Sequence, residues 1–142
     1  MESVLITGST GLLGSNLHDL LLAQGYNTYS VSKIKNKKEN INHISIDFTK
    51  DWDIKQLPEN IDVIIHLAQS RKYRDFPESA DNIFKVNIES TQKLLNFAKK
   101  MNIKKFIYAS SGGVYGNGDE AFKENSPITP PVKLGYYLGS KA

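Results

Sequence analysis

Tyr137 and Lys141 lie four residues apart and are the side chains in this sequence best suited to proton transfer. Four residues of a helix turn through about 400°, which would place the two side chains only about 40° apart on one face. A phenol with a pKa of about 10 is a poor acid or base at neutral pH, and a nearby ammonium would lower that pKa. Tyr136 would lie about 140° from Lys141, so the spacing favours Tyr137. A tyrosine and a lysine four apart also occur on solvated helices that have no chemical role.

Ser111 is a third candidate, because it ends an apolar segment that we expect to be a strand. In sheets of parallel strands, ligands collect at the carboxyl ends of the strands. A serine hydroxyl there could donate a hydrogen bond to a substrate oxygen and accept one from a neighbour. Its alternative role is to cap a helix or to form a turn.

The segment Gly8-Ser9-Thr10-Gly11-Leu12-Leu13-Gly14 has glycines at every third position. It lies between a short apolar run and an amphipathic stretch, which predicts strand, glycine turn and helix. Glycine allows a phosphate to approach backbone N–H groups closely, and a helix N-terminus carries partial positive charge. We therefore expect a pyrophosphate-binding turn, although glycine is common in any turn from strand to helix.

The elements that must position these residues alternate between strand and helix. Such alternation predicts an α/β fold of the Rossmann type, with a doubly wound parallel sheet of about five strands. The expected strands are Val4–Ile6, Asn27–Ser32, Ile44–Phe48, Asp62–Ala68 and Lys104–Ser111.

Two helices are predicted from apolar residues at spacings of three and four. The first follows the glycine turn, with Leu13, Leu17, Leu20 and Leu21 as its apolar face. The second is longer, and its apolar face comprises Ile83, Val86, Ser90, Leu94, Ala98 and Met101. Asn87 lies on that face, where we expect it to make structural hydrogen bonds, and we expect His66 to be a hydrogen-bonded residue at a strand end rather than a catalyst.

Ordered motifs between Val4 and Lys141 resemble those of the extended short-chain dehydrogenase/reductase family, in its NAD-dependent epimerase/dehydratase group. They are the TGxxGxxG turn, Asp47 closing the third strand before Phe48, His66-Leu67-Ala68, Val86-Asn87, the SSxxVYG pattern at Ser110–Gly116, and YxxxK at Tyr137–Lys141.

The resemblance implies NAD(P)-dependent hydride transfer on a nucleotide-linked sugar, with Tyr137 as acid and base. Ser111 would polarise the same substrate oxygen, and Lys141 would bind the nicotinamide ribose. Asp47 would bind the adenine amino group. The residues implied to bind cofactor are Gly8, Thr10, Gly11, Leu12, Gly14, Ser32, Lys33, Asp47, Phe48, Leu67, Ala68, Asn87, Tyr137 and Lys141. Gly112 and Gly113 stand where dehydratases of the family carry Asp-Glu, which favours an epimerase or a reductase.

The sequence departs from the family pattern at one place that bears on the choice between NAD and NADP. Ser32 and Lys33 stand where members that bind NAD usually place an acidic residue for the ribose diol. Ser32 would not repel a 2′-phosphate and Lys33 could attract one, so NADP is slightly favoured over NAD. Lys33 also begins a basic run with Lys35, Lys37 and Lys38, which could instead be a solvated loop or a nucleic-acid contact.

Composition sets the remaining expectations. The chain has 142 residues, a formal charge of +3 and no cysteine, which fits one soluble, cytoplasmic domain without disulfides or thiolate metal sites. The sequence shows neither a membrane-spanning run nor a signal peptide, no metal-ligand pattern and no serine-hydrolase elbow. A homodimer is possible.

We expect residues 1–142 to be one NAD(P)-binding domain that stops within the Tyr-Lys helix and lacks a C-terminal substrate domain. We expect residues 1–142 by themselves to bind the cofactor weakly and to show negligible turnover of substrate. The alternatives are a dinucleotide-binding module without catalysis and, less favoured, a basic nucleic-acid-binding protein.

Overall fold

Five parallel strands form one sheet in the order β3-β2-β1-β4-β5. The computed structural model describes residues 1–34, 42–119 and 121–142. The strand order reverses next to β1, as in a Rossmann fold, so the predicted fold class is confirmed. The strands are β1 Ser3–Thr7, β2 Asn27–Ser32, β3 Asn42–Ser45, β4 Val63–His66 and β5 Lys105–Tyr108.

The strand boundaries agree best with prediction in the middle of the sheet. β2 has the predicted limits, whereas β3 lies earlier in the chain than expected and β5 ends at Tyr108 instead of Ser111. Among the described residues β5 is an edge strand that pairs with β4 alone, and the chain leaves the sheet after the Ala109 N–H donates to the His66 carbonyl. Ser111 and Asp47 therefore follow their strands by a few residues.

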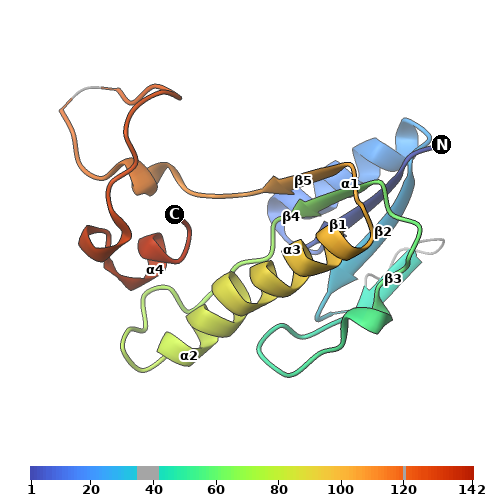
Figure 1. The fold of residues 1–142 in the computed structure, drawn as a ribbon, viewed down its shortest axis with the longest axis horizontal. Helices are drawn as coiled ribbons and strands as arrows, with labels where there is room; N and C mark the ends of the chain where they lie inside the picture. Colours follow the sequence, from blue (N-terminus) through green and yellow to red (C-terminus); the bar gives the residue numbers. More distant parts are fainter. Residues whose placement is uncertain (35–41, 120) are drawn as a thin grey trace.

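Helices cover both faces of the sheet (Figure 1). Helix α1, Leu12–Ala23, packs on β1 and β2, with Gly14 and His18 buried. The predicted apolar face was wrong in part, because Leu13 and Leu20 are exposed. The helix is rotated toward Gly14, whose missing side chain lets the first turn approach the glycine loop.

The second predicted helix runs from Ala80 to Lys100 and contains a π-helical stretch. It comprises α2 Ala80–Ile83, the π-helix Phe84–Glu89 and α3 Ser90–Lys100. Its predicted face is confirmed, and it packs over the sheet on the side opposite α1 (Figure 1). The main core lies between this long helix and the sheet, and it includes Leu5, Val31, Ile64, Val86, Leu94, Phe97 and Ala98.

The C-terminal segment, residues 109–119 and 121–142, extends beyond the carboxyl ends of the strands (Figure 1). It contains 3-10 turns at Gly112–Tyr115 and Pro131–Lys133 and a short helix, α4 Gly135–Gly139. Another 3-10 turn, Ile54–Gln56, precedes β4. No helix among the described residues is long and apolar enough to cross a membrane.

Candidate dinucleotide and catalytic site

The glycine turn adopts a conformation that requires glycine at two positions. Gly8 has φ +69°, and a Cβ there would lie 2.8 Å from the backbone nitrogen of Ala68. A Cβ on Gly14 would overlap the carbonyl oxygen of Gly8. The turn is fixed to β2 because the Gly8 N–H donates to the Val31 carbonyl at 2.9 Å. Gly8 thus shapes the turn and Gly14 lets α1 begin directly beside it.

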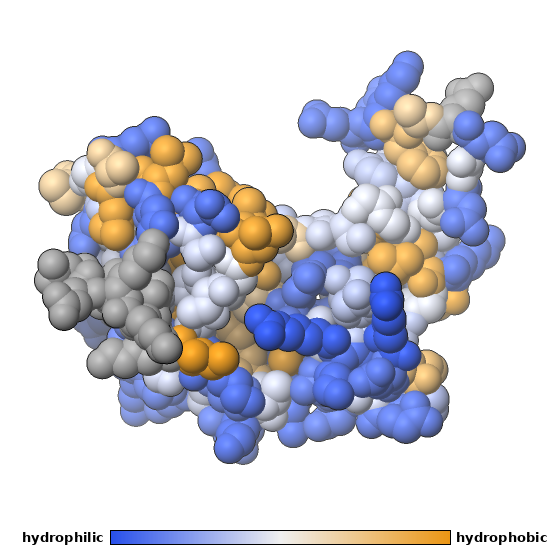
Figure 2. Space-filling view, turned by 180° about the vertical axis from the view of Figure 1, so that it is seen from behind, coloured by the Kyte–Doolittle hydropathy of each residue, from blue (hydrophilic) through white to orange (hydrophobic). Residues whose placement is uncertain are grey.

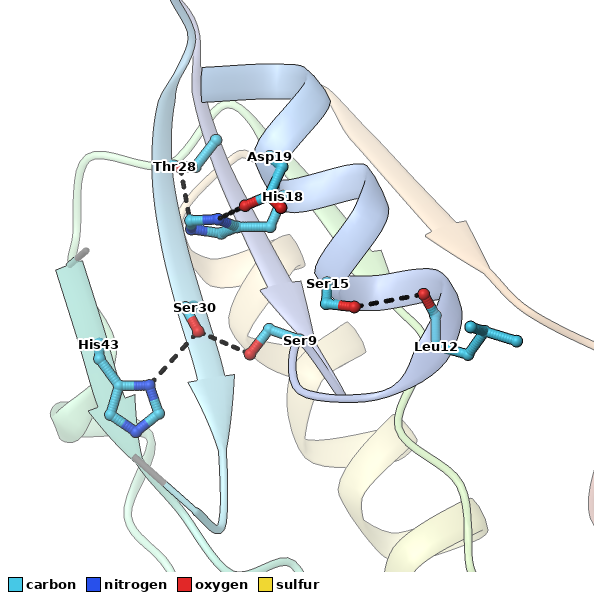
Figure 3. Close-up of polar contacts among 8 residues, drawn as sticks. All are labelled: Ser9, Leu12, Ser15, His18, Asp19, Thr28, Ser30 and His43. Carbon is cyan, nitrogen blue, oxygen red and sulfur yellow. Dashed lines mark hydrogen bonds and ion pairs between the residues drawn. The ribbon is translucent and has the colours of Figure 1, made fainter. Parts of the chain in front are cut away.

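The N-terminus of α1 is open to a ligand. Gly11 is the N-cap and provides no side-chain cap, and the following Leu12 is 88% exposed. The side chain of Leu12 points away from the turn (Figure 3). Exposed backbone N–H groups at a helix N-terminus, beside a turn without side chains, match the requirements of a pyrophosphate. The glycines predicted for this role thus lie together between the end of β1 and the first turn of α1, and their binding of a pyrophosphate stays a prediction.

A polar network that the sequence did not predict joins the turn to the neighbouring strands (Figure 3). The hydroxyls of Ser9 and Ser30 are joined at 2.6 Å, and the Ser30 hydroxyl is 3.3 Å from Nδ1 of His43. Ser9 also donates to the Val31 carbonyl at 3.3 Å. The network ties the glycine turn to β2 and β3, and Ser9 and Ser30 are fully buried.

The end predicted for adenosine contains an ion pair. Lys33 Nζ lies 2.9 Å from Oδ2 of Asp47, and Oδ1 of Asp47 accepts hydrogen bonds from the backbone and hydroxyl of Thr49. Burial acts to raise the pKa of Asp47, but the hydrogen bonds from Thr49 and Lys33 outweigh it and lower that pKa to about 2. Ser32 is buried and donates to the Ile34 carbonyl at 2.6 Å. Phe48, next to Asp47, is buried in the core. Lys35, Lys37 and Lys38 lie outside the described residues.

His66 holds together the segments that surround the turn. The Thr91 hydroxyl donates to the Asn87 carbonyl at 2.6 Å, so His66 Nε2 must donate to Thr91 at 2.9 Å. Nδ1 then accepts from the Thr7 hydroxyl, which accepts in turn from the N–H of Ala68 at 3.2 Å. Burial, with the charge of Lys141, lowers the pKa of His66 to about 3. This neutral, fully bonded histidine confirms the structural role expected for it. The backbone of Leu67 lies against Gly8.

Asn87 joins the loop after β4 to the end of the chain. Its Oδ1 accepts from the Ser70 N–H and its Nδ2 donates to the Ser140 hydroxyl, both at 2.8 Å. The residue is 2% exposed and lies within the π-helical stretch. The expected structural hydrogen bonding is confirmed. Ser70 and Ser140 are partners that spacing alone did not indicate.

Tyr137 contacts the loop after β4 rather than Lys141. Its hydroxyl donates to Oε1 of Gln69 at 2.9 Å, and its ring centroid lies 5.2 Å from that of Tyr73. Burial, together with the neighbouring Tyr73, raises the pKa of Tyr137. The expectation that an ammonium lowers this pKa was therefore wrong for the protein in this state.

Lys141 lies outside the helix that was expected to carry it, because α4 ends at Gly139. Lys141 is only 2% exposed, and its Nζ lies 4.4 Å from the centroid of the Tyr108 ring. Burial lowers the pKa of Lys141 to about 8. The helical geometry assumed for the pair was wrong, since Tyr137 and Lys141 do not share a face of one helix.

Ser111 lies beside the Tyr-Lys segment without bonding to it. Its hydroxyl accepts from the Gly113 N–H at 3.3 Å, which is the capping role given as its alternative. Gly113 packs on Leu138, and the Ser110 hydroxyl donates to the Lys141 carbonyl at 2.6 Å. Within the part of the chain that the structure describes, no hydrogen bond or ion pair joins the side chains of the three predicted catalytic residues, which are Ser111, Tyr137 and Lys141.

A hollow separates the part of the molecule that carries the sheet from the C-terminal segment (Figure 2). The glycine turn follows β1 in the part that carries the sheet, and α4 belongs to the C-terminal segment. Residues 1–34, 42–119 and 121–142 contain no cluster of His, Cys, Asp or Glu that could hold a metal ion.

Comparison with known proteins gives matches along nearly the whole chain. The model of the NAD dependent epimerase/dehydratase family matches residues 4–142. The chain is 31% identical to dTDP-D-glucose 4,6-dehydratase of Mus musculus, with 99% of the chain and 43% of the relative covered. It is 29% identical to sterol-4-alpha-carboxylate 3-dehydrogenase, decarboxylating, of Dictyostelium discoideum, with 100% and 46% covered.

Solved structures give the same result. The chain has a TM-score of 0.81 and 26% identity to UDP-glucuronic acid 4-epimerase from Bacillus cereus in complex with NAD, with 98% of the chain and 48% of that protein covered. The chain thus spans about half the length of the curated relatives and solved structures that it matches.

Proposed function

The chain belongs to the NAD dependent epimerase/dehydratase family. We propose that its function is that of an NAD(P)-dependent epimerase or reductase that acts on a nucleotide-linked sugar. The observation that carries this proposal is the glycine turn. Gly8 and Gly14 leave no room for side chains, and the N-terminus of α1 is open where a pyrophosphate would bind. The similarity to a nucleotide-sugar epimerase in complex with NAD supports the substrate class.

The proposed chemistry belongs to residues around the hollow. When bound, the nicotinamide ring accepts or donates a hydride. Tyr137 exchanges a proton with the substrate hydroxyl or carbonyl, and Ser111 donates a hydrogen bond to the same oxygen. Lys141 binds the nicotinamide ribose and favours the phenolate of Tyr137. To do so, Lys141 must leave the Tyr108 ring and Tyr137 must release Gln69.

Gly112 and Gly113 favour epimerisation or reduction over dehydration. They follow Ser111 in the positions where dehydratases of the family carry an acid pair, and they begin a 3-10 turn with no carboxylate of its own. A Cβ on Gly113 would meet the Leu138 side chain at 2.8 Å, so a larger side chain there would force Leu138 to move. We propose a site without the additional acid that loss of water requires.

NADP is proposed to be accepted alongside NAD. Ser32 has no charge that would oppose a 2′-phosphate, and Lys33 carries one that would attract it. Lys33 also forms an ion pair with Asp47, so a 2′-phosphate must compete with Asp47 for it. The preference between NADP and NAD therefore depends on the strength of that ion pair.

A dinucleotide-binding module without catalysis is the second candidate. This candidate is favoured because the Tyr137 hydroxyl is hydrogen-bonded to Gln69 and the Lys141 ammonium lies over the Tyr108 ring. In these positions neither group is oriented for proton transfer. Both candidates require a bound dinucleotide, and only the first requires Tyr137.

The experiment that separates them uses the longest available form of the protein, with UDP-glucose and NAD as probes. Tyr137→Phe should abolish conversion of the sugar while NADH affinity stays within about twofold, because the phenol oxygen acts only in the chemical step. Tyr136→Phe is the matched control, since that ring stacks on Phe76 and has no assigned chemistry. Full activity of Tyr137→Phe would contradict the catalytic proposal, and absence of NADH binding would contradict both candidates.

A further inference from the structure

Lys33 and Asp47 meet where two neighbouring strands end. Ser32 of β2 stands opposite Ser45 of β3, and the Ile46 N–H donates to the Ser32 carbonyl at 3.2 Å. The residues that follow the strands, Lys33 and Asp47, are thereby brought together into the 2.9 Å ion pair. The same end of β2 holds the glycine turn through Val31. The pair therefore borders the proposed dinucleotide site on its adenosine side.

The two partners are held unequally. Asp47 has only 18% of its side chain exposed, and Thr49 fixes Oδ1 through hydrogen bonds of 2.7 and 3.0 Å. With a pKa of about 2, its carboxylate is charged throughout the neutral range. Lys33 is 67% exposed and has four rotatable methylenes. Asp47 is therefore the fixed charge and Lys33 the movable one.

A 2′-phosphate on the adenosine ribose would compete with Asp47 for this lysine. It carries about two negative charges at neutral pH, so it is attracted by Lys33 and repelled by the carboxylate next to it. NAD has a neutral diol at that position and does not compete. The ion pair thus penalises one dinucleotide and leaves the other unaffected.

We propose that Asp47 is a specificity-determining residue for the adenosine end of the cofactor, because its pairing with Lys33 withholds that cation from a 2′-phosphate and shifts the site toward NAD. The inference rests on the proposed dinucleotide site. It gives Asp47 a role in discriminating the ribose, in addition to any contact with adenine.

Two small nucleotides isolate this effect without catalysis. Adenosine 5′-monophosphate and adenosine 2′,5′-bisphosphate differ only in the 2′-phosphate, and calorimetry on the 142-residue chain gives both affinities. Asp47→Asn should improve the bisphosphate relative to the monophosphate by about fivefold, the strength of a well-formed exposed ion pair. Asp51→Asn is the matched control, because it removes an exposed carboxylate from the same segment and should change the ratio less than twofold.

A second set of variants tests the pairing itself. In a Lys33→Met background, Asp47→Asn should no longer favour the bisphosphate to the same extent. Lys33→Met should also raise the pKa of Asp47, measured by carboxyl carbon shifts in NMR, whether or not a nucleotide binds. An unchanged ratio in Asp47→Asn, or an equal gain without Lys33, would overturn the inference while the dinucleotide site stands. If neither nucleotide nor NADH binds to the wild type, the proposed function fails and the inference fails with it.

Discussion

The Tyr137 hydroxyl donates its hydrogen bond to Gln69 at 2.9 Å, in the loop that follows β4. A phenol that donates to an amide oxygen is held in its neutral form, because a phenolate would be repelled by the same oxygen. Burial and Tyr73 act in the same direction on the Tyr137 pKa. The loop after β4 therefore sets both the position and the protonation of the proposed acid-base residue.

This contact predicts that Tyr137 titrates above pH 10 in the protein without cofactor. Its phenolate is measured as the difference in ultraviolet absorbance between wild type and Tyr137→Phe during a pH titration. Since the pKa of Tyr137 is raised relative to the unfolded chain, the stability that this group contributes to the folded state is lost only as pH rises past 10. A tyrosine that ionises near neutral pH and is lost in Tyr137→Phe would contradict this expectation.

Gly14→Ala should destabilise the fold although alanine is the better helix former. The gain in helix propensity is about 1 kcal/mol, whereas a Cβ pressed against the Gly8 backbone costs about 1–3 kcal/mol and has no rotamer in which to yield. Urea unfolding measures the difference. Gly112→Ala is the control, because a Cβ there meets nothing within 4 Å and should change stability by less than about 0.5 kcal/mol. Equal effects of the two substitutions would refute the packing role of Gly14.

The buried His66 should make the fold sensitive to acid. Its folded pKa of about 3 is below the value near 6.5 of an unfolded histidine, so the unfolded chain binds a proton that the folded one does not. Stability should fall by about 1.4 kcal/mol for each pH unit below 6.5, down to about pH 3. Urea unfolding of wild type and His66→Gln across this range measures how the free energy of unfolding depends on pH. This dependence should be weaker in the variant. An identical slope in both proteins would exclude His66 as its source.

Asn87→Leu should loosen the attachment of the C-terminal segment. The change leaves the buried Ser70 N–H without its acceptor and the Ser140 hydroxyl without its donor, a cost of about 1–3 kcal/mol. Hydrogen exchange should show the largest loss of protection at residues 69–72 and 137–141. Asn96→Leu, on the exposed side of α3, is expected to leave both regions unchanged. Loss of stability without faster exchange in those segments would argue against the bridging role.

Features determined by neighbouring residues could be predicted from the sequence. The limits of β2, the glycine turn and the buried face of the long helix follow from spacing, backbone conformation and apolar periodicity. The face of α1 was misjudged, because the close approach at Gly14 overrides the pattern of leucines and leaves Leu13 exposed.

The parts of the site that depend on distant contacts could not be predicted. Gln69 is 68 residues from Tyr137 in sequence, and Lys141 finds its place on Tyr108 only after β5 and the C-terminal segment have packed. A spacing of four residues assumes a continuous helix, and α4 ends two residues before Lys141. The residues of the candidate site stay a prediction from sequence motifs, and their mutual geometry could not be predicted from the spacing.

The most direct test of the account is to map NAD binding on the isotope-labelled 142-residue chain by NMR. Titration to millimolar NAD should shift the backbone amides of Gly8, Gly11 and Leu12 saturably, because they line the proposed pyrophosphate site. The amide of Gly25, at the opposite end of α1, should stay in place. Shifts confined to other regions, or no shifts at that concentration, would contradict the claim that the glycine turn binds a dinucleotide.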